Sequence, residues 1–191
     1  MTSIAFLVLR LAVGGLLAGH GAQKLFGFDS GPGLEGTQKM MGRLGIRPAD
    51  RWALLAGTSE FLGGVLTTIG LLNPLGPIMA MGSMATASMT AHKDKPIWGT
   101  AGGAELPVTN LAALAALVLA GPGKLSLDAI FRTKVPWWFS FLALAGVGYG
   151  VAIAAPPAPI ALPAPDPQQS ATPGVAAREA MQSEQSVEAT A

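Results

Sequence analysis

The 191-residue chain contains no cysteine. Without a thiol it cannot form a disulfide, use a thiolate as catalyst or iron–sulfur ligand, or attach a c-type haem covalently. Histidine is nearly as scarce, because only His20 and His92 are present. The sequence has no His-x-x-x-His or Glu-x-x-His spacing, the patterns that build metal sites on helices. We therefore expect no metal centre, and a haem between the two histidines has no motif to support it.

Charge is also sparse, since only 12% of the residues are charged against about a quarter in a soluble domain. The formal net charge of +1 offers no basic face that would neutralise phosphates, which excludes nucleic acid as a partner. Half of the residues are hydrophobic, and the mean hydropathy is +0.46. This composition is typical of a membrane protein whose first partner is the lipid bilayer.

The apolar residues gather into five segments, and a helix needs about 20 such residues to cross the hydrocarbon core. The segments cover residues 1–19, 52–72, 74–91, 101–120 and 135–155. Because no basic residue precedes the first segment and Arg10 interrupts it, we interpret it as a retained membrane helix and not as a signal peptide. The sequence therefore predicts an all-α membrane protein, with a four-helix transmembrane bundle in residues 1–134 and a fifth transmembrane helix in 135–155.

The connections and the C-terminus differ from these segments in composition. Residues 34–44 and 124–134 mix apolar and polar side chains, which predicts interfacial helices or re-entrant pieces. Asn73 is expected to cap the third helix, with Pro74 at the first helical position. Residues 156–191 contain seven prolines and few large apolar side chains, which predicts a disordered tail rich in Pro, Ala and Gln.

Lysine and arginine fall unequally on the two sides of such an up-and-down chain. Eight lie in the connections after the first and third helices and in the tail, whereas three lie between the fourth and fifth helices. Cytoplasmic loops carry the excess of basic residues in membrane proteins. This bias predicts a multi-pass plasma-membrane protein with its N-terminus outside and its tail in the cytoplasm.

Polar residues inside or beside the apolar segments are the candidate functional residues. In an up-and-down chain, the first and third helices end on the side where the second and fourth begin. Glu60 lies about 13 Å into the second helix at 1.5 Å per residue. The residues that this topology directs toward one side of the membrane are His20, Gln23, Lys24, Glu60, His92 and Glu105.

Arg10 and Glu60 are the expected buried pair, because an isolated charge inside a membrane costs several kcal/mol. Small residues accompany both positions on their helices, which indicates faces that turn toward the bundle interior. Each polar residue also has a purely structural explanation. The pair can simply fix two helices, Lys24 can extend to lipid phosphates, and His92 can belong to a solvated interfacial turn with its neighbouring lysines.

A polar site on one side of an apolar bundle suits a ligand with a polar head and a lipid-soluble body. Quinone carbonyls accept hydrogen bonds, and a neighbouring carboxylate and histidine can relay the protons of quinone reduction. We expect a quinone as the cofactor. The candidate ligands are Arg10, His20, Gln23, Lys24, His92 and Glu105, and the candidate catalytic residues are His20, Lys24, Glu60, His92 and Glu105.

The sequence resembles the DoxX family of small bacterial membrane proteins over residues 4–130. The resemblance rests on Arg10, His20-Gly21-Ala22-Gln23-Lys24-Leu25-Phe26-Gly27, Glu60 before Gly63-Gly64, His92, Gly102-Gly103-Ala104-Glu105 and Gly121-Pro122-Gly123-Lys124. It implies a four-helix membrane core and a link to quinone-dependent oxidoreduction. Some relatives are associated with terminal quinol oxidase or thiosulfate:quinone oxidoreductase. One actinobacterial member is associated with a membrane complex of superoxide dismutase and a sulfurtransferase.

Two departures from the family shape the functional expectation. The chain adds a fifth apolar segment and a Pro-rich tail, and it has no cysteine with which to handle sulfur itself. We expect an integral membrane subunit of a quinone-linked oxidoreductase or of a detoxification complex in redox homeostasis. The alternatives are a non-catalytic scaffold that recruits soluble redox enzymes on the cytoplasmic side, and a small-solute permease. Whether the chain is itself an enzyme, and its oligomeric state, stay open.

Overall fold

The computed structural model describes residues 2–154, which belong to one compact unit and contain α-helices and short 3-10 turns but no β-strand. The helices are α1 (Thr2–Phe26), α2 (Gly33–Arg43), α3 (Ala49–Ile69), α4 (Leu75–Met89), α5 (Glu105–Ala120), α6 (Leu127–Phe131) and α7 (Trp137–Ala154). The predicted all-α class is confirmed. The predicted tail, 156–191, lies outside the described residues.

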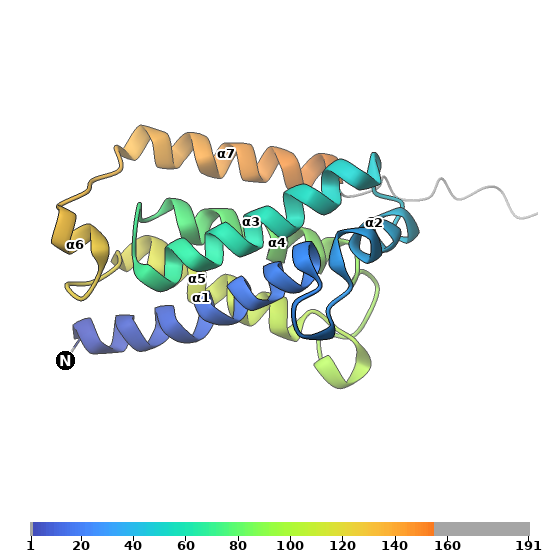
Figure 1. The fold of residues 1–191 in the computed structure, drawn as a ribbon, viewed down its shortest axis with the longest axis horizontal. Coiled ribbons are helices and arrows are strands. Elements are labelled where there is room, and N and C mark those ends of the chain that lie inside the picture. The colour runs from blue at the N-terminus through green and yellow to red at the C-terminus, as the bar shows by residue number, and fades with distance from the viewer. Residues whose placement is uncertain (1, 155–191) are drawn as a thin grey trace, which may run out of the picture. The chain divides into compact units, whose positions relative to one another are not determined.

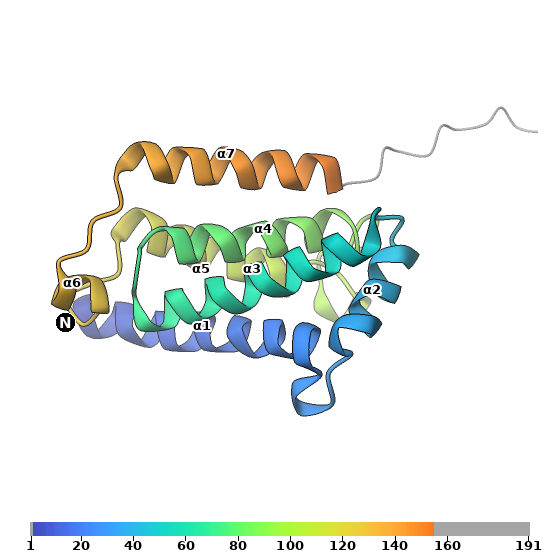
Figure 2. The same ribbon diagram turned by 45° about the horizontal axis from the view of Figure 1, so that its top comes forward.

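The long helices run up and down beside one another (Figure 1). Helix α3 packs between α1 and α4, α5 packs on α4, and α7 lies along α4 as a further helix (Figure 2). Helices α1, α3 and α7 are long and apolar enough to cross a membrane. With 15 and 16 residues, α4 and α5 are shorter than the usual span of about 20. Crossing by four helices plus one therefore stays a prediction.

Two helix boundaries differ from the predicted ones for local reasons. Helix α1 continues to Phe26 and not to Gly19, because the next left-handed glycine is Gly27, with φ 70°. His20, Gln23 and Lys24 are therefore helical residues. Helix α5 begins at Glu105, since a 3-10 turn over Gly99–Ala101 and the positive φ of Gly102 (72°) precede it.

Asp128, and not the Asn73 side chain, holds the turn that precedes α4. The Asn73 side chain does not cap α4, which begins at Leu75 after Pro74. Instead, the backbone N–H groups of Leu72 and Asn73 donate to the two Asp128 carboxylate oxygens at 2.9 and 2.8 Å. The capping prediction was wrong because α4 begins one residue later than expected, so that Pro74 and not Asn73 is in the cap position.

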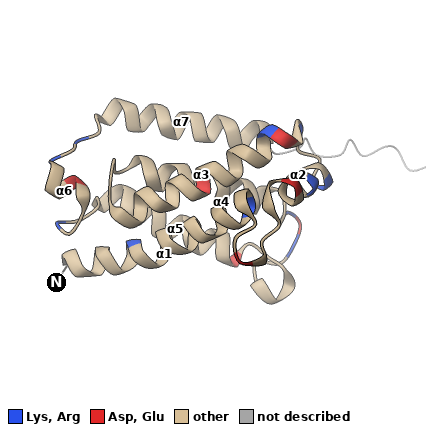
Figure 3. Ribbon diagram, in the orientation of Figure 1, with Lys and Arg blue, Asp and Glu red and all other residues tan. Residues whose placement is uncertain are grey.

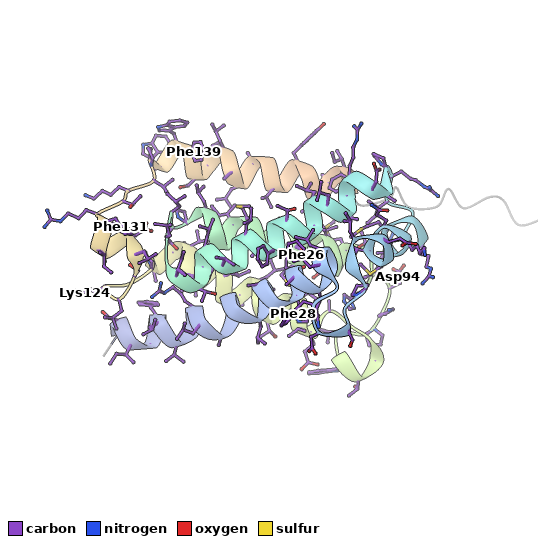
Figure 4. The ribbon with its side chains drawn as sticks, viewed as in Figure 1. Phe26, Phe28, Asp94, Lys124, Phe131 and Phe139 are labelled. Carbon is purple, nitrogen blue, oxygen red and sulfur yellow. The ribbon has the colours of Figure 1, made fainter. Side chains whose placement is uncertain are left out.

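The two interfacial segments form short helices. Helix α2, in the first connection, packs on α1 and α3. Helix α6, in the second, begins after Ser126, whose hydroxyl accepts the Ala129 N–H at 3.2 Å. Figure 3 shows charged residues mostly at the two ends of the bundle. Figure 4 labels Phe28 and Asp94 toward the α2 end, and Lys124 and Phe131 at the α6 end.

Glycines fix the register between α1 and α3. A Cβ added to Gly14 would lie 2.7 Å from the Thr68 backbone nitrogen, and one added to Gly57 would lie 2.7 Å from Leu25 Cδ2. Gly21 packs just as closely on the backbone of Phe61. Small residues let membrane helices approach in this way. The resulting antiparallel register places Lys24, and not Arg10, beside the middle of α3.

Candidate functional site

A cavity of about 400 Å³ lies in the α2 half of the bundle. Its walls come from α2, α3, α4 and α7, and its lining is predominantly apolar. Ile78 and Ser83 of α4 are buried at its base, whereas Leu55 of α3 is 55% exposed at its edge. Sites for small molecules in proteins have volumes of about 300–1,000 Å³ and combine apolar walls with a few polar groups. The size and lining are therefore those of a small-molecule site.

Lys24 is the one charged residue among the residues that line this cavity. Its ammonium contacts the carboxylate of Glu60, which is buried between the helices with only 2% of its side chain exposed. The same carboxylate oxygen accepts a hydrogen bond from the Ser83 hydroxyl at 3.2 Å. Lysine carries three donors, so the contact with Glu60 leaves others for a ligand. The cavity thus has a cationic hydrogen-bond donor that a buried acid holds in place.

Helix α2 and the start of α3 close the cavity at the connection after α1. Met41 and Ile46 are buried there with Ala53, and Trp52 packs against this cluster. Thr37 anchors the helix, because its hydroxyl lies 2.8 Å from the Gly33 carbonyl and 3.1 Å from the Lys24 carbonyl. The sequence indicated an interfacial helix here but gave no sign that it would line a site.

The outer side of α2 carries an exposed ion pair. Lys39 Nζ lies 2.7 Å from Glu35 Oε1, one turn apart on the helix. The hydrogen bond and charge of Lys39 lower the pKa of the Glu35 carboxyl. Neither residue lines the cavity. The pair is therefore an exposed ion pair with which the Lys24–Glu60 pair can be compared.

Helix α7 supplies the remaining wall. The residues that line the cavity are Ala143, Gly146, Val147, Gly150 and Val151. Their spacing of three and four residues is that of one helix face. Sequence reasoning missed this face because every other face of α7 is also apolar or small, so periodicity did not mark it.

The other predicted residues lie outside the lining of the cavity. His20 Nδ1 lies 3.2 Å from Gln23 Oε1, and His20 is exposed. His92 Nδ1 lies 2.7 Å from the Gly102 carbonyl, and Glu105 accepts the Gly99 N–H at 2.7 Å. His92 and Glu105 therefore hold the connection between α4 and α5. The structure brings together Lys24 and Glu60, while the other four make local contacts.

Arg10 corrects the predicted pairing. It is 1% exposed, as a buried residue should be, but it does not contact Glu60. Its guanidinium donates to the Leu125 carbonyl and packs against Gly70 at the end of α3, and Asp128 is the acidic group whose charge acts on it. The α1–α3 register explains the error, because Arg10 lies four turns before Lys24 and faces the opposite end of α3. The Arg10–Glu60 prediction was wrong in partner and right in burial.

The family comparison agrees with a multi-pass membrane protein. A family model described as DoxX matches residues 5–93. Residues 5–93 of the chain belong to the DoxX family. Membership suggests a multi-pass membrane protein associated with quinone-linked oxidoreductases. No curated protein and no solved structure was found to match the chain.

The DoxX match contains most of the cavity but not all of it. Lys24, Glu60 and Ser83 lie within the matched segment, which ends at residue 93. The α7 wall lies beyond it. Among residues 2–154, no three His, Asp or Glu side chains gather in a metal-binding group.

Proposed function

We propose that the chain is the membrane subunit of a quinone-linked oxidoreductase and that the cavity binds the quinone head group beside Lys24. The observation that carries the proposal is the Lys24–Glu60 pair at a predominantly apolar cavity. A quinone ring is apolar on its faces and accepts hydrogen bonds only at its carbonyl oxygens. Those requirements match apolar walls with one cationic donor.

The residues present fit a quinone in three respects. Lys24 Nζ would donate a hydrogen bond to a carbonyl oxygen, and its positive charge would stabilise the negative charge that reduction places on that oxygen. Glu60 fixes the Lys24 side chain from behind and keeps the pair neutral, so the buried site needs no further counter-ion. Ser83 restricts the Glu60 carboxylate through its hydroxyl. When bound, the quinone supplies the two-electron, two-proton redox chemistry.

The positions of the other predicted residues narrow the site. Because His20, His92 and Glu105 lie outside the cavity lining, Lys24 is the one charged proton donor that lines the cavity. The membrane orientation inferred from the basic residues places this end of the bundle on the cytoplasmic side. A soluble redox partner would then reach the site from the cytoplasm.

Tryptophan fluorescence tests the proposal, because quinones quench nearby indoles and Trp52 lines the cavity. Replacing the exposed Trp98, Trp137 and Trp138 by Phe leaves Trp52 as the only reporter. The full chain in lipid nanodiscs is titrated with a tail-less benzoquinone and a tail-less naphthoquinone. We expect saturable quenching by at least one of them. No saturable quenching by either ring would contradict the proposal.

Variants at the pair locate the site. A hydrogen bond from a charged group contributes about 1.5–3 kcal/mol, so Lys24→Met should weaken binding by roughly 10- to 100-fold. The double variant Lys24→Met/Glu60→Gln leaves no charge at the position of the pair, so it separates loss of the ammonium from misfolding caused by an unpaired carboxylate. Lys39→Met removes an exposed lysine from α2 and should bind as the parent does. Equal affinities in all three variants would exclude Lys24 from the site.

A further inference from the structure

The α7 wall indicates how a membrane quinone would be seated, an inference that rests on the proposed function. We infer that the prenyl tail leaves the cavity sideways between α3 and α7, over Gly146 and Gly150, while the head group stays at Lys24. The cavity, at about 400 Å³, holds a molecule of the size of a small drug and not a long prenyl chain as well. The tail must therefore pass out through one wall.

On the α7 wall, space is left at a position where two membrane helices would normally contact each other. Gly146 and Gly150 have the Gly-x-x-x-Gly spacing that lets membrane helices approach closely. Here a Cβ added to either glycine would meet no atom within 4 Å. The two glycines line the cavity and do not contact a neighbouring helix. Their missing side chains leave a passage.

Helix α7 packs on one side only, against α4, and this places the passage next to α3. Helix α7 lies along α4, where a Cβ at Gly82 would lie 3.2 Å from Val147 Cγ1. Within residues 2–154, α7 has no comparable packing on α3 or α2. Leu55 on α3 and Gly146 on α7 both line the cavity, and both are exposed. These residues form the edges of a side opening.

The depth of the opening selects a lipid-soluble occupant. Gly146 lies near the middle of α7, which is 18 residues long and apolar enough to cross a membrane. The outer face of α7 is exposed and hydrophobic at Phe141, Leu142 and Ile153. An opening at this level meets hydrocarbon and not water. A ligand that uses it carries an apolar chain, as a prenyl quinone does.

Paired probes test the passage. The Trp52-only chain in nanodiscs is titrated with the tail-less dimethoxy-methyl-benzoquinone ring and with the same ring bearing a decyl chain. Gly146→Leu and Gly150→Leu fill the passage with a side chain that the structure accommodates. Gly148→Leu is the matched control, because Gly148 is also free of neighbours within 4 Å but does not line the cavity.

We expect Gly146→Leu and Gly150→Leu to weaken binding of the decyl-bearing ring at least tenfold and to change the affinity of the tail-less ring less than twofold. Gly148→Leu should bind both as the parent does. The inference is overturned if Gly146→Leu and Gly148→Leu have equal effects on the decyl-bearing ring. It is also overturned if filling the passage weakens both probes equally. Failure of both rings to bind the parent would instead reject the proposed function.

A second measurement does not depend on substitutions at α7. A benzoquinone whose decyl chain ends in a photoreactive diazirine is irradiated with the unmodified full chain in nanodiscs. Mass spectrometry of the peptides should find the label on α7 around Gly146–Val151 or on α3 around Leu55, and an excess of unlabelled decyl compound should remove it. Competed labelling confined to α1 or α5 would overturn the passage.

Discussion

Lys24 and Glu60 join α1 to α3 through an ion pair whose two ends differ in exposure, at 22% for the Lys24 side chain and 2% for that of Glu60. The buried carboxylate depends on its partners, since Lys24 and Ser83 both bond to the same oxygen. The partly exposed ammonium can still reach water or lipid phosphates. This asymmetry gives the two halves of the pair different importance for stability.

Removing Lys24 should therefore destabilise the fold more than removing the Glu60 charge. Lys24→Met leaves an unpaired buried carboxylate, which should cost about 3–5 kcal/mol. Glu60→Gln leaves a lysine that can turn outward, so the loss should be smaller. Equilibrium unfolding in mixed detergent micelles, followed by tryptophan fluorescence, measures both.

A third variant checks the assignment. Lys24→Met/Glu60→Gln should recover part of the stability lost in Lys24→Met, because no unpaired charge remains. Lys39→Met on the exposed face of α2 should leave stability unchanged. Equal losses for Lys24→Met and Glu60→Gln would contradict the asymmetry.

The contact between α1 and α3 predicts different outcomes at two glycines of the same helix. Gly21→Ala would place a methyl group against the backbone of Phe61, which cannot move aside as a flexible side chain can. We expect a loss of about 1–3 kcal/mol. Gly15→Ala adds the same group where no atom lies within 4 Å, and alanine favours helix over glycine. It should keep or slightly raise the thermal stability measured for the parent in detergent.

The register set by such contacts explains what the sequence could and could not predict. The long apolar helices and the placement of Lys24, Glu60 and His92 in one half follow from hydropathy and from the alternation of up and down helices. Whether Glu60 meets Arg10 or Lys24 depends on the sliding of α1 along α3 by four turns. That choice rests on the fit of Gly14 and Gly21 into α3, which single-helix patterns do not encode.

The cavity could not be predicted from the sequence, for a related reason. Its walls join Met41 of α2, Ile78 of α4 and Gly146 of α7, which are far apart along the chain. An empty space arises where packing between elements is incomplete, and no local pattern marks it. Only the charged member of the lining, Lys24, was detectable, because a charge inside an apolar segment is conspicuous.

Asp128 should hold α6 to the connection between α3 and α4, at the end of the bundle opposite α2. Its carboxylate accepts the N–H groups of Leu72 and Asn73, and its charge acts on the buried Arg10. Asp128→Ala should expose the two amides, so their hydrogen exchange should accelerate by at least tenfold. Asp128→Asn keeps one acceptor and should lie between that variant and the parent. Asp94→Ala, at an exposed aspartate in another connection, should leave both amides protected.

The exposed pair on α2 gives a pH-dependent prediction of known sign. Lys39 lowers the pKa of Glu35, so the carboxylate persists to lower pH than in an isolated glutamate. The interaction supports the folded state above the ordinary pKa and is lost as pH falls through the lowered one. Lys39→Met should raise the pKa of Glu35, as measured by carbon NMR of its labelled carboxyl group. An unchanged titration would show that the pair does not form in solution.

Docking of α2 should depend on Thr37, whose buried hydroxyl bonds to the Lys24 and Gly33 carbonyls. Thr37→Val keeps the shape but loses the donor, at a cost of about 1 kcal/mol. A cost of that size shifts the docking equilibrium roughly fivefold.

The chain has no cysteine, so Met41→Cys places a single thiol on the buried face of α2. Thr37→Val should raise the labelling rate of that thiol by a maleimide about fivefold. Thr109→Val, which removes a similar but exposed hydroxyl bond on α5, should leave the rate unchanged. Equal rates in both backgrounds would show that Thr37 does not hold α2 over the cavity.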